Sequence, residues 1–379
     1  MSAKLTPPVP EEIQAQLETP CIVIDLTQTR RNIIRLQEAA NRAGCAVRPH
    51  IKTHKMGRFA LMQIQAGAQG ITCAKISEAE VMASAGVDDI FIAYPLVGAF
   101  RLRRAAALAP KVRRLILGVD SIEGAHALNQ TAEDLGQTFE VRLEIDTGAK
   151  RTGVDYNEAL HTAQAIEACR GLRLTGVYTF KSLVYQGKPT TDGAAAGREE
   201  GELLAEIAMR LRQAGIPITD ISAGSTPTGI HVAETGLVTE IRPGTYIFND
   251  YMLYKEGAAD LEDIAAFLYV TVVSTPRKDY AVIDGGTKTF PMDIFLNTPP
   301  YFYLSYAMID GRDDLVLTRL NEEHGMLTSL TGVTGLRIGQ ILRLIPIHIC
   351  TALNLQNQVY LFDQGDLQTA RIDARGMLA

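Results

Sequence analysis

Eight short runs rich in β-branched and other apolar residues constrain the fold of this chain more than any other feature. The runs cover residues 46–51, 70–74, 89–94, 113–119, 140–145, 173–179, 217–222 and 238–241. Stretches with apolar residues at helical spacing lie between most of them, including 77–86, 121–136, 157–171 and 198–215. Parallel strands joined by crossover helices give this alternation, and eight of them favour a closed barrel over an open sheet. The sequence therefore predicts an α/β fold built on a (β/α)8 TIM-type barrel.

The segments on either side of the barrel have a different pattern. Residues 1–18 contain three prolines and are expected to form an arm on the surface or on a partner. A strand is predicted at 21–26 and a helix at 27–44. After residue 246 strand signals dominate, at 267–273, 280–283, 325–331, 341–347 and 359–362. We therefore predict a barrel domain at 27–245 and a C-terminal mostly-β domain made of 1–26 plus 246–379.

Composition narrows the class of protein. Hydrophobic residues make up 46% and charged residues 21% of the 379 residues, as in a globular protein. The formal net charge of -6, without a dense Lys/Arg tract, argues against nucleic acid as a partner. No signal-peptide pattern opens the chain and no apolar run reaches the roughly 18 residues of a membrane span. The five cysteines show no disulfide spacing, so a cytoplasmic location is expected.

A basic cluster, Arg48-Pro49-His50-Ile51-Lys52-Thr53-His54-Lys55, follows the first predicted barrel strand. Active groups of TIM barrels lie on the loops at the carboxyl ends of the strands, and Lys52 falls just past such an end. A lysine amine loses its proton readily when desolvated and then forms Schiff bases with carbonyl compounds. The alternative for Lys52 and Lys55 is an ordinary surface lysine. We interpret the cluster as the site of a carbonyl cofactor held on a lysine.

Other strand ends also carry polar or glycine-rich groups. Residues 144–153, after the fifth strand, include Arg151 in a loop that two glycines allow to turn tightly. Small residues at 222–226, after the seventh strand, would expose backbone N–H groups to an anion, and 242–246 follow the eighth. Loops after strands seven and eight of such barrels often bind phosphate. Each of these turns is common by itself, and together they indicate a phosphate-binding site.

Near the end of the chain, His348 and Cys350 are two positions apart in an apparent continuation of the strand at 341–347. Alternate residues of a strand point to one face, so both side chains could bind one ion. A buried structural cysteine beside a hydrogen-bonded histidine is the alternative reading. Residues 322–324 (Glu-Glu-His) provide further ligand-type groups in the same domain. This ligand mixture suits zinc better than manganese or cobalt.

Taken together, these motifs resemble the D-threonine aldolase and D-serine dehydratase family, which are alanine racemase-like enzymes of the fold-type III pyridoxal phosphate class. The resemblance rests on Thr19-Pro20-Cys21 leading to Asp25, on the 48–55 cluster, on Asp146-Thr147-Gly148 with Arg151-Thr152-Gly153, and on the turn at 222–226. It continues with Pro243-Gly244-Thr245-Tyr246, with 322–325 and with His348-Ile349-Cys350. These motifs span nearly the whole chain in order.

The resemblance implies a role for each candidate residue. Lys52 would bind pyridoxal 5'-phosphate covalently, with His50 as a second catalytic residue, and Arg151 would lie against the pyridine nitrogen. The remaining cofactor ligands would be Tyr178, Ser222, Gly224, Ser225, Thr226 and Tyr246. His348 and Cys350 would hold a divalent metal (Zn, Mn or Co) near the β-hydroxyl of the substrate.

The same resemblance implies a lyase that acts on small β-hydroxy-D-amino acids, usually as a homodimer. We expect retro-aldol cleavage of the D-threonine aldolase type, to glycine and an aldehyde. The first alternative is D-serine dehydratase-type elimination to a keto acid and ammonia. An amino-acid racemase or epimerase, and a cofactor carrier without activity, are less favoured alternatives. One departure from the family occurs at Lys181-Ser182-Leu183, where related chains tend to have a small residue and a histidine.

Overall fold

The computed structural model describes residues 5–379, which divide into two compact units. The barrel unit comprises Ile34–Gly244 with Gly376–Ala379. The β unit comprises the described residues up to Ile33 together with Thr245–Arg375. Helix α2 (Leu26–Arg42) spans the division between them. The sequence predicted boundaries before residue 27 and after residue 245, and this domain division stays a prediction.

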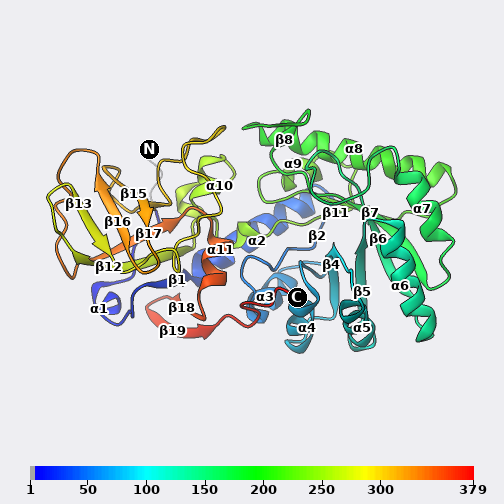
Figure 1. Cartoon of the computed structure of the whole chain (residues 1–379), viewed down its shortest axis with the longest axis horizontal. Coiled ribbons are helices and arrows are strands. Elements are labelled where there is room, and N and C mark those ends of the chain that lie inside the picture. The colour runs from blue at the N-terminus through cyan, green and yellow to red at the C-terminus, as the bar shows by residue number, and fades with distance from the viewer. Residues whose placement is uncertain (1–4) are drawn as a thin grey trace. The chain divides into compact units, whose positions relative to one another are not determined.

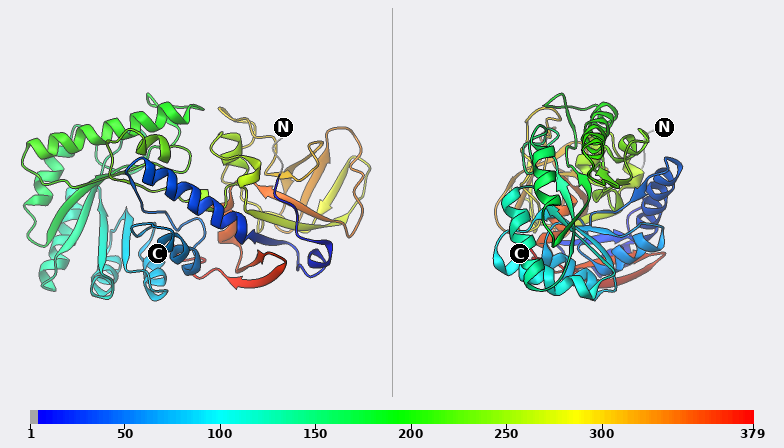
Figure 2. Two further views of the ribbon diagram at one scale, coloured as in Figure 1. Left: turned by 180° about the vertical axis from the view of Figure 1, so that it is seen from behind. Right: turned by 90° about the vertical axis from the view of Figure 1, so that its right-hand side faces the viewer.

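The barrel unit contains eight parallel strands, and all eight predicted strands are confirmed (Figure 1). They are β2 (Ala46–Val47), β3 (Ile71–Cys73), β4 (Asp89–Pro95), β5 (Arg114–Val119), β6 (Phe139–Glu144), β7 (Leu172–Tyr178), β10 (Asp220–Ala223) and β11 (Glu240–Ile241). The helices are α3 (Gly57–Gln65), α4 (Ile76–Ser84), α5 (Ala99–Leu108), α6 (Ile122–Asp134), α7 (Ala159–Glu167), α8 (Gly193–Gln213) and α9 (Gly229–Ala233). These helices lie on the outside of the strands (Figure 2). A short hairpin of β8 (Val184–Tyr185) and β9 (Lys188–Pro189) follows β7.

Hydrogen bonds join the two ends of the strand order β2-β11-β10-β7-β6-β5-β4-β3. His50, just beyond β2, forms a parallel bridge with Thr72 of β3. The N–H of Ile51 donates to the Thr72 carbonyl at 2.9 Å, and the N–H of Thr72 donates to the Pro49 carbonyl at 2.8 Å. The sheet is therefore closed, as the predicted TIM-type barrel requires.

The barrel interior contains a network of buried ion pairs as well as apolar side chains. Arg48 and Arg142 are both fully buried, and both bind Glu240 of β11, at 2.7 and 2.6 Å. Arg48 also pairs with Asp89, and Arg142 pairs with Asp220 at 3.0 Å. Buried cations are tolerated only when their charge is compensated in this way. The network therefore holds several strands in a fixed arrangement.

The β unit is built on a nine-stranded sheet in the order β15-β16-β13-β12-β1-β18-β19, with β17 paired to β12 and β14. The strands are β1 (Cys21–Asp25), β12 (Ala266–Ser274), β13 (Tyr280–Ile283), β14 (Ala307–Ile309), β15 (Leu315–Leu320), β16 (Gly325–Ser329), β17 (Ile341–Pro346), β18 (Gln358–Asp363) and β19 (Asp366–Arg371). Three short helices accompany them: α1 (Glu11–Gln14), α10 (Tyr251–Lys255) and α11 (Ile349–Leu355). All six strands predicted outside the barrel are confirmed, whereas β14, β15 and β19 were not predicted.

Two expectations for this unit are wrong. The N-terminal segment is not a surface arm over its described part, because Val9 and Leu17 are buried in one apolar cluster with Phe267 and Tyr269; residues 1–4 lie outside the described part of the chain. The strand predicted at 341–347 does not continue through His348 and Cys350. It ends at Pro346, His348 caps α11, and Cys350 lies within that helix.

The sequence predicted neither disulfides nor a membrane-spanning segment. None of the five cysteines forms a disulfide. Within residues 5–379, no helix is both long enough and apolar enough to cross a membrane.

Candidate functional site

Lys52 lies in a tight turn beyond the carboxyl end of β2, and the residues around it are anchored. The N–H of Met56 donates to Nδ1 of His54, and Nε2 of His54 lies 3.2 Å from the Gln63 side chain. Lys55 is buried and pairs with Glu78 at 2.8 Å. Lys55 is thus neither a surface lysine nor a free amine, which leaves Lys52 as the lysine of this turn that is only half-buried.

The loop after β6 is shaped by Asp146 and Gly153. One carboxylate oxygen of Asp146 accepts hydrogen bonds from the N–H groups of Gly148, at 2.8 Å, and Lys150, at 3.1 Å. At Gly153, φ is +103° and a Cβ would lie 2.7 Å from the Asp146 nitrogen, so only glycine fits. The tight turn predicted from the two glycines is present, and Arg151 is exposed on it.

Lys52 and Arg151 lie over the same aromatic ring, that of Phe180. The Nζ atom of Lys52 is 5.6 Å from the centre of this ring, and the Cζ atom of Arg151 is 4.5 Å from it. Phe180 lies two residues beyond the end of β7. Residues from the ends of three strands therefore converge at the carboxyl end of the barrel, where active sites of this architecture lie. Attraction between each cation and the ring helps to hold both side chains there.

His50 completes this group. Its Nδ1 accepts a hydrogen bond from the backbone N–H of Lys52 at 3.3 Å. Burial lowers the pKa of His50 well below its ordinary value, and the nearby charges of Lys52, Arg242 and Arg151 lower it further. The imidazole is consequently neutral at neutral pH. With Nδ1 accepting, the ring proton is assigned to Nε2.

The 242–246 segment approaches the Lys52 turn closely. A Cβ on Gly244 would lie 2.9 Å from the His50 carbonyl oxygen and 3.1 Å from Oγ1 of Thr53, so the chain needs glycine here. Arg242, which precedes it, is buried and donates to Ser222 Oγ at 2.6 Å and to the carbonyl oxygen of Thr179. Its charge contributes to the positive environment of His50.

Tyr178 and Ser222, which were predicted to bind the cofactor, have protein partners inside the barrel. Tyr178 donates from its hydroxyl to Glu144 at 3.0 Å and packs edge-on against Phe91. The Ser222 hydroxyl donates to Glu240 at 2.6 Å and accepts from Arg242. Both hydroxyls thus donate to carboxylates of the barrel. Their predicted cofactor role stays a prediction.

The small-residue turn after β10 is also internally bonded. The N–H of Gly224, where φ is +82°, donates to the buried Glu200 at 3.2 Å. The N–H of Ser225 donates to Thr228 Oγ1 at 3.1 Å, and Thr226 Oγ1 accepts from the N–H of Gly244 at 3.3 Å. This last bond ties the loops after strands seven and eight together. Phosphate binding by Gly224, Ser225 and Thr226 stays a prediction.

The predicted metal pair and Tyr246 belong to the β unit. His348 Nδ1 lies 2.6 Å from Oδ2 of Asp293, and Thr351 donates to the same oxygen at 3.0 Å. Cys350 forms a side-chain interaction with His348 and lies 3.4 Å from the Thr245 hydroxyl. Burial lowers the pKa of His348, but Cys350 and Asp293 outweigh burial and raise it well above the ordinary value. The side chains of His348 and Cys350 thus interact, although these residues lie at the start of helix α11 and not in the strand that was predicted to align them.

The other predicted ligand groups of this unit are placed differently. Glu322 and His324 are exposed in the turn between β15 and β16, and Glu323 pairs with Lys288 at 2.5 Å. Asp293, not residue 322, 323 or 324, is the acidic group bound to His348. Over residues 5–379, no cluster of three or more His, Cys, Asp or Glu side chains has a metal-binding arrangement. The described ligand set is therefore a pair, supported by one carboxylate.

Comparison with known proteins identifies the family of the chain. Residues 24–252 match the family model described as the alanine racemase N-terminal domain, and residues 265–362 match the putative serine dehydratase domain. A D-threonine aldolase of an Arthrobacter species is 31% identical over 98% of this chain and 97% of its own length. The chain belongs to the D-threonine aldolase and D-serine dehydratase family. A second member, D-threo-3-hydroxyaspartate dehydratase of a Delftia species, is 34% identical over 93% of this chain and 96% of its own.

Solved structures of family members have the same fold. The D-threonine aldolase of Filomicrobium marinum superimposes with a TM-score of 0.85 at 26% identity, covering 96% of this chain and 98% of that one. The Delftia dehydratase gives 0.85 at 32% identity, covering 94% and 97%. The alanine racemase-like fold expected from the sequence is thereby confirmed.

Sequence reasoning missed three residues of the site. Arg242 belongs to the segment noted after the eighth strand, and Phe180 immediately precedes the departure noted at Lys181-Ser182-Leu183. Their positions shortly after β11 and β7 were the signal that could have identified them. Asp293 lies in a loop 55 positions from His348, and no spacing in the sequence connects the two.

Proposed function

We propose that this protein is a lyase that uses pyridoxal 5'-phosphate to act on β-hydroxy-D-amino acids, with aldol cleavage of the D-threonine aldolase type as its first activity. The observation that carries the proposal is the convergence of Lys52 and Arg151 on the Phe180 ring, in a chain that matches such lyases along nearly its whole length. An amine and a guanidinium held by one aromatic ring at the carboxyl end of a barrel suit an anionic aldehyde.

The charges around His50 fit this cofactor. Lys52, Arg242 and Arg151 all depress the pKa of His50, which means that the three cations raise the local potential together. A positive potential favours a phosphate-bearing ligand. Lys52 would hold the aldehyde, Arg151 the pyridine ring, and the loops ending in Thr226 and Gly244 the phosphate. Pyridoxal phosphate supplies an electron-accepting ring for the pair of electrons released at Cα.

The protein groups then have separate tasks. The Phe180 ring helps to hold both cationic side chains, because Lys52 Nζ and Arg151 Cζ lie 5.6 and 4.5 Å from its centre. His50 is neutral and has its proton on Nε2. It can donate this proton, and after donation the same atom can accept a proton again. Its Nδ1 stays occupied by the Lys52 N–H, so the ring orientation is set by the same turn that positions the amine.

The donor set at His348 fits a divalent metal ion. A metal-binding histidine commonly donates its second ring N–H to a carboxylate, and Asp293 accepts at Nδ1 in this way. Nε2 of His348 and the sulfur of Cys350 would then be the ligands, a combination that suits zinc better than manganese or cobalt. Such a metal would supply Lewis acidity toward a substrate hydroxyl. D-threo-3-hydroxyaspartate dehydratase has been solved as a histidine mutant and as a cysteine mutant in the metal-free form, at positions two residues apart.

Dehydration is the second candidate function, and the His348-Cys350 pair favours it. The two positions mutated in D-threo-3-hydroxyaspartate dehydratase have the spacing of this pair. Against this, the D-threonine aldolase of Arthrobacter covers a larger share of the chain. The distinguishing experiment incubates the loaded protein with D-threonine, D-serine and D-threo-3-hydroxyaspartate and measures aldehyde plus glycine separately from keto acid plus ammonia. Turnover of none of these or longer β-hydroxy-D-amino acids would refute the lyase.

Racemisation has less support. Residues 265–362 match a dehydratase domain, and the alanine racemase of Clostridium difficile is related at 15% identity, which indicates the fold alone. A racemase needs no metal, so loss of activity in chelator with recovery on adding zinc or manganese would separate the two classes.

A homodimer is proposed as the working form. The loop between β13 and β14 exposes a group of large apolar side chains, namely Met292, Phe295, Phe302 and Leu304 at 48%, 76%, 56% and 57%. Several large apolar side chains exposed in one loop are more typical of a protein interface than of plain surface. Light scattering after size exclusion would give the mass, and a monomer at micromolar concentration would contradict the proposal. A cytoplasmic location stays a prediction.

A further inference from the structure

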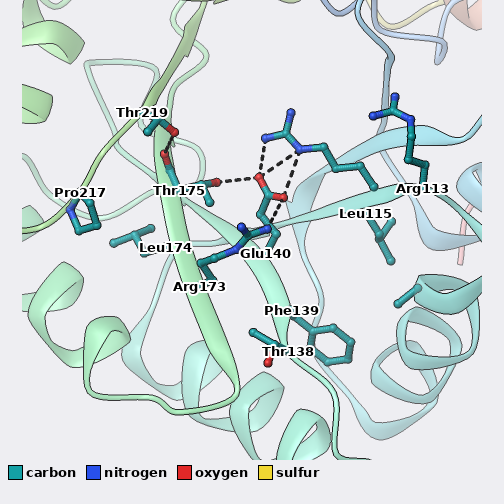
Figure 3. A pocket seen from close by; sticks show the side chains of 12 residues that line it. Arg113, Leu115, Thr138, Phe139, Glu140, Arg173, Leu174, Thr175, Pro217 and Thr219 are labelled. Atoms are coloured by element: carbon teal, nitrogen blue, oxygen red, sulfur yellow. Dashed lines mark hydrogen bonds and ion pairs between the residues drawn. The ribbon is translucent and has the colours of Figure 1, made fainter.

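A second pocket lies at the amino-terminal end of the barrel strands, opposite the end that carries Lys52. It has a volume of about 640 Å³ and is formed where β5, β6, β7 and β10 begin (Figure 3). All of its lining residues belong to the barrel unit. Pockets for small ligands commonly have volumes of this size.

Three arginines and one carboxylate line this pocket. The arginines are Arg113, Arg114 and Arg173, and the carboxylate is Glu140. The Arg113 and Arg173 side chains are 60% and 67% exposed, whereas Glu140 is 7% exposed. Arg113 and Arg173 are therefore accessible to a ligand from solvent, whereas Glu140 is largely covered.

The acceptor capacity of Glu140 is already used. Arg114 donates to it from Nε and Nη2, the shortest of these bonds being 2.5 Å. Arg173 donates to it from Nη2 at 3.1 Å, and Thr175 from Oγ1 at 2.9 Å. Figure 3 shows this carboxylate enclosed by its donors. Burial raises the pKa of Glu140, but Arg114 and its other donors more than offset this and keep the group ionised.

Hydrogen-bond donors remain on the arginines. Arg113 uses Nε toward Asp88 at 3.4 Å and Nη2 toward Asp89 at 3.1 Å, and Arg173 uses Nη2 alone. Asp89 also binds Arg48, and Asp220 is shared by Arg114 and Arg142, so the surrounding carboxylates are engaged as well. Among the contacts of residues 5–379, the other N–H groups of Arg113 and Arg173 have no acceptor. The pocket thus has arginine N–H groups without a protein acceptor, and the one carboxylate that lines it already accepts from Arg114, Arg173 and Thr175.

We infer that this pocket is a binding site for a small oxyanion with two negative charges, a phosphate or a dicarboxylate, separate from the Lys52 site. Guanidinium groups bind both kinds of anion through paired, charge-assisted hydrogen bonds. Arg113 and Arg173 supply the N–H groups that are open to the anion. Arg114 is held in place by Glu140 and Asp220 and adds a fixed positive charge. The bound anion would join the amino ends of β5 and β7.

Isothermal titration calorimetry of the cofactor-loaded protein tests this inference. Inorganic phosphate and succinate serve as two separate probes, at constant ionic strength, with chloride as the monovalent comparison. Loading the cofactor first removes the phosphate-binding capacity of the other end of the barrel from the measurement. We expect saturable binding of at least one probe with Kd of about 1 mM or tighter, and no saturable binding of chloride.

Variants locate the binding. Arg173→Ala and Arg113→Ala should each weaken it by about tenfold or more, because each removes charge-assisted donors. Both side chains are largely exposed, so circular dichroism should show unchanged folding. Arg42→Ala, at an exposed arginine in the last turn of α2, is the matched control and should leave Kd unchanged. Absence of saturation up to about 20 mM, or equal Kd in all three variants, would overturn the inference.

Discussion

The Nδ1 atom of His348 lies 2.6 Å from the Oδ2 atom of Asp293. This contact gives the predicted metal ligand a defined ring orientation, because a histidine that donates from Nδ1 must bind a metal through Nε2. Asp293→Ala should therefore weaken metal binding by about 10–100-fold, which is typical for loss of such a carboxylate. Zinc affinity measured by competition with a chromogenic chelator would check this. Asp366→Ala, at an exposed aspartate of β19, should leave the affinity unchanged, and an equal loss in both would contradict the role of Asp293.

Phe180 is the second residue whose removal has a defined consequence. Phe180→Leu keeps an apolar side chain but removes the ring that Lys52 and Arg151 share. At about 1 kcal/mol for such contacts, we expect affinity for pyridoxal phosphate to fall by roughly fivefold. Absorbance titration of the cofactor-free protein would measure this.

A matched control exists in the same unit. Arg101 lies 4.3 Å from the Phe100 ring, at an exposed position in α5. Phe100→Leu removes a cation–ring contact of the same kind and should not change cofactor affinity. Unaltered affinity in Phe180→Leu would show that the shared ring does not position Lys52.

Glu240 should be essential for stability because it compensates two fully buried arginines. Glu240→Gln leaves the charges of Arg48 and Arg142 only partly compensated and should lower the free energy of unfolding by about 3–5 kcal/mol at pH 7. Urea unfolding measures this. Glu234→Gln, at an exposed glutamate after α9, is the control and should change the free energy of unfolding by less than about 0.5 kcal/mol.

The same residue predicts a pH dependence. Burial raises the pKa of Glu240, but Arg142 and Arg48 outweigh it and hold the pKa far below the ordinary value. The stabilisation is therefore complete above the unfolded pKa of about 4.3 and is lost as the pH falls toward the folded value. The stability difference between the native protein and Glu240→Gln should consequently narrow below about pH 4. A difference that stays constant down to pH 3 would contradict the ion-pair account.

His50 should remain neutral where an ordinary histidine gains a proton. Its pKa is lowered well below 6.5 by burial and by Lys52, Arg242 and Arg151. The ring signals of His50, assigned by comparison with His50→Gln, should not shift in NMR spectra between about pH 5.5 and 8. Titration of these signals near pH 6.5 would show that the three cations do not act on the ring.

The sequence predicted the barrel well because its signal is local and repeated. Each strand is a short β-branched run beside a helical stretch, and the eight-fold alternation has few other solutions. The prediction failed where local pattern and tertiary structure disagree. His348-Ile349-Cys350 continues an apolar run, yet Asp250 accepts the N–H of Ile349 at 3.0 Å and a helix starts there. Strand β19 was missed because it is a polar edge strand without apolar alternation.

The site was predicted in the same uneven way. Lys52, His50 and Arg151 follow strand ends and could be found by position, since parallel strands bring their carboxyl ends together. Ser222 and Tyr178 occupy equivalent positions, but their hydroxyls bind Glu240 and Glu144. Only the three-dimensional packing shows which polar groups at a strand end are already bonded within the barrel.

The central claim is that Lys52 carries the cofactor. Its most direct test is reduction of the protein with borohydride after loading with pyridoxal phosphate, followed by peptide mapping of the modified lysine. We predict that the visible absorption band disappears on reduction and that the phosphopyridoxyl group is found on Lys52, with the band absent from Lys52→Ala. A group found on Lys55, Lys181 or another lysine, or a protein that stays colourless with the cofactor, would contradict the account.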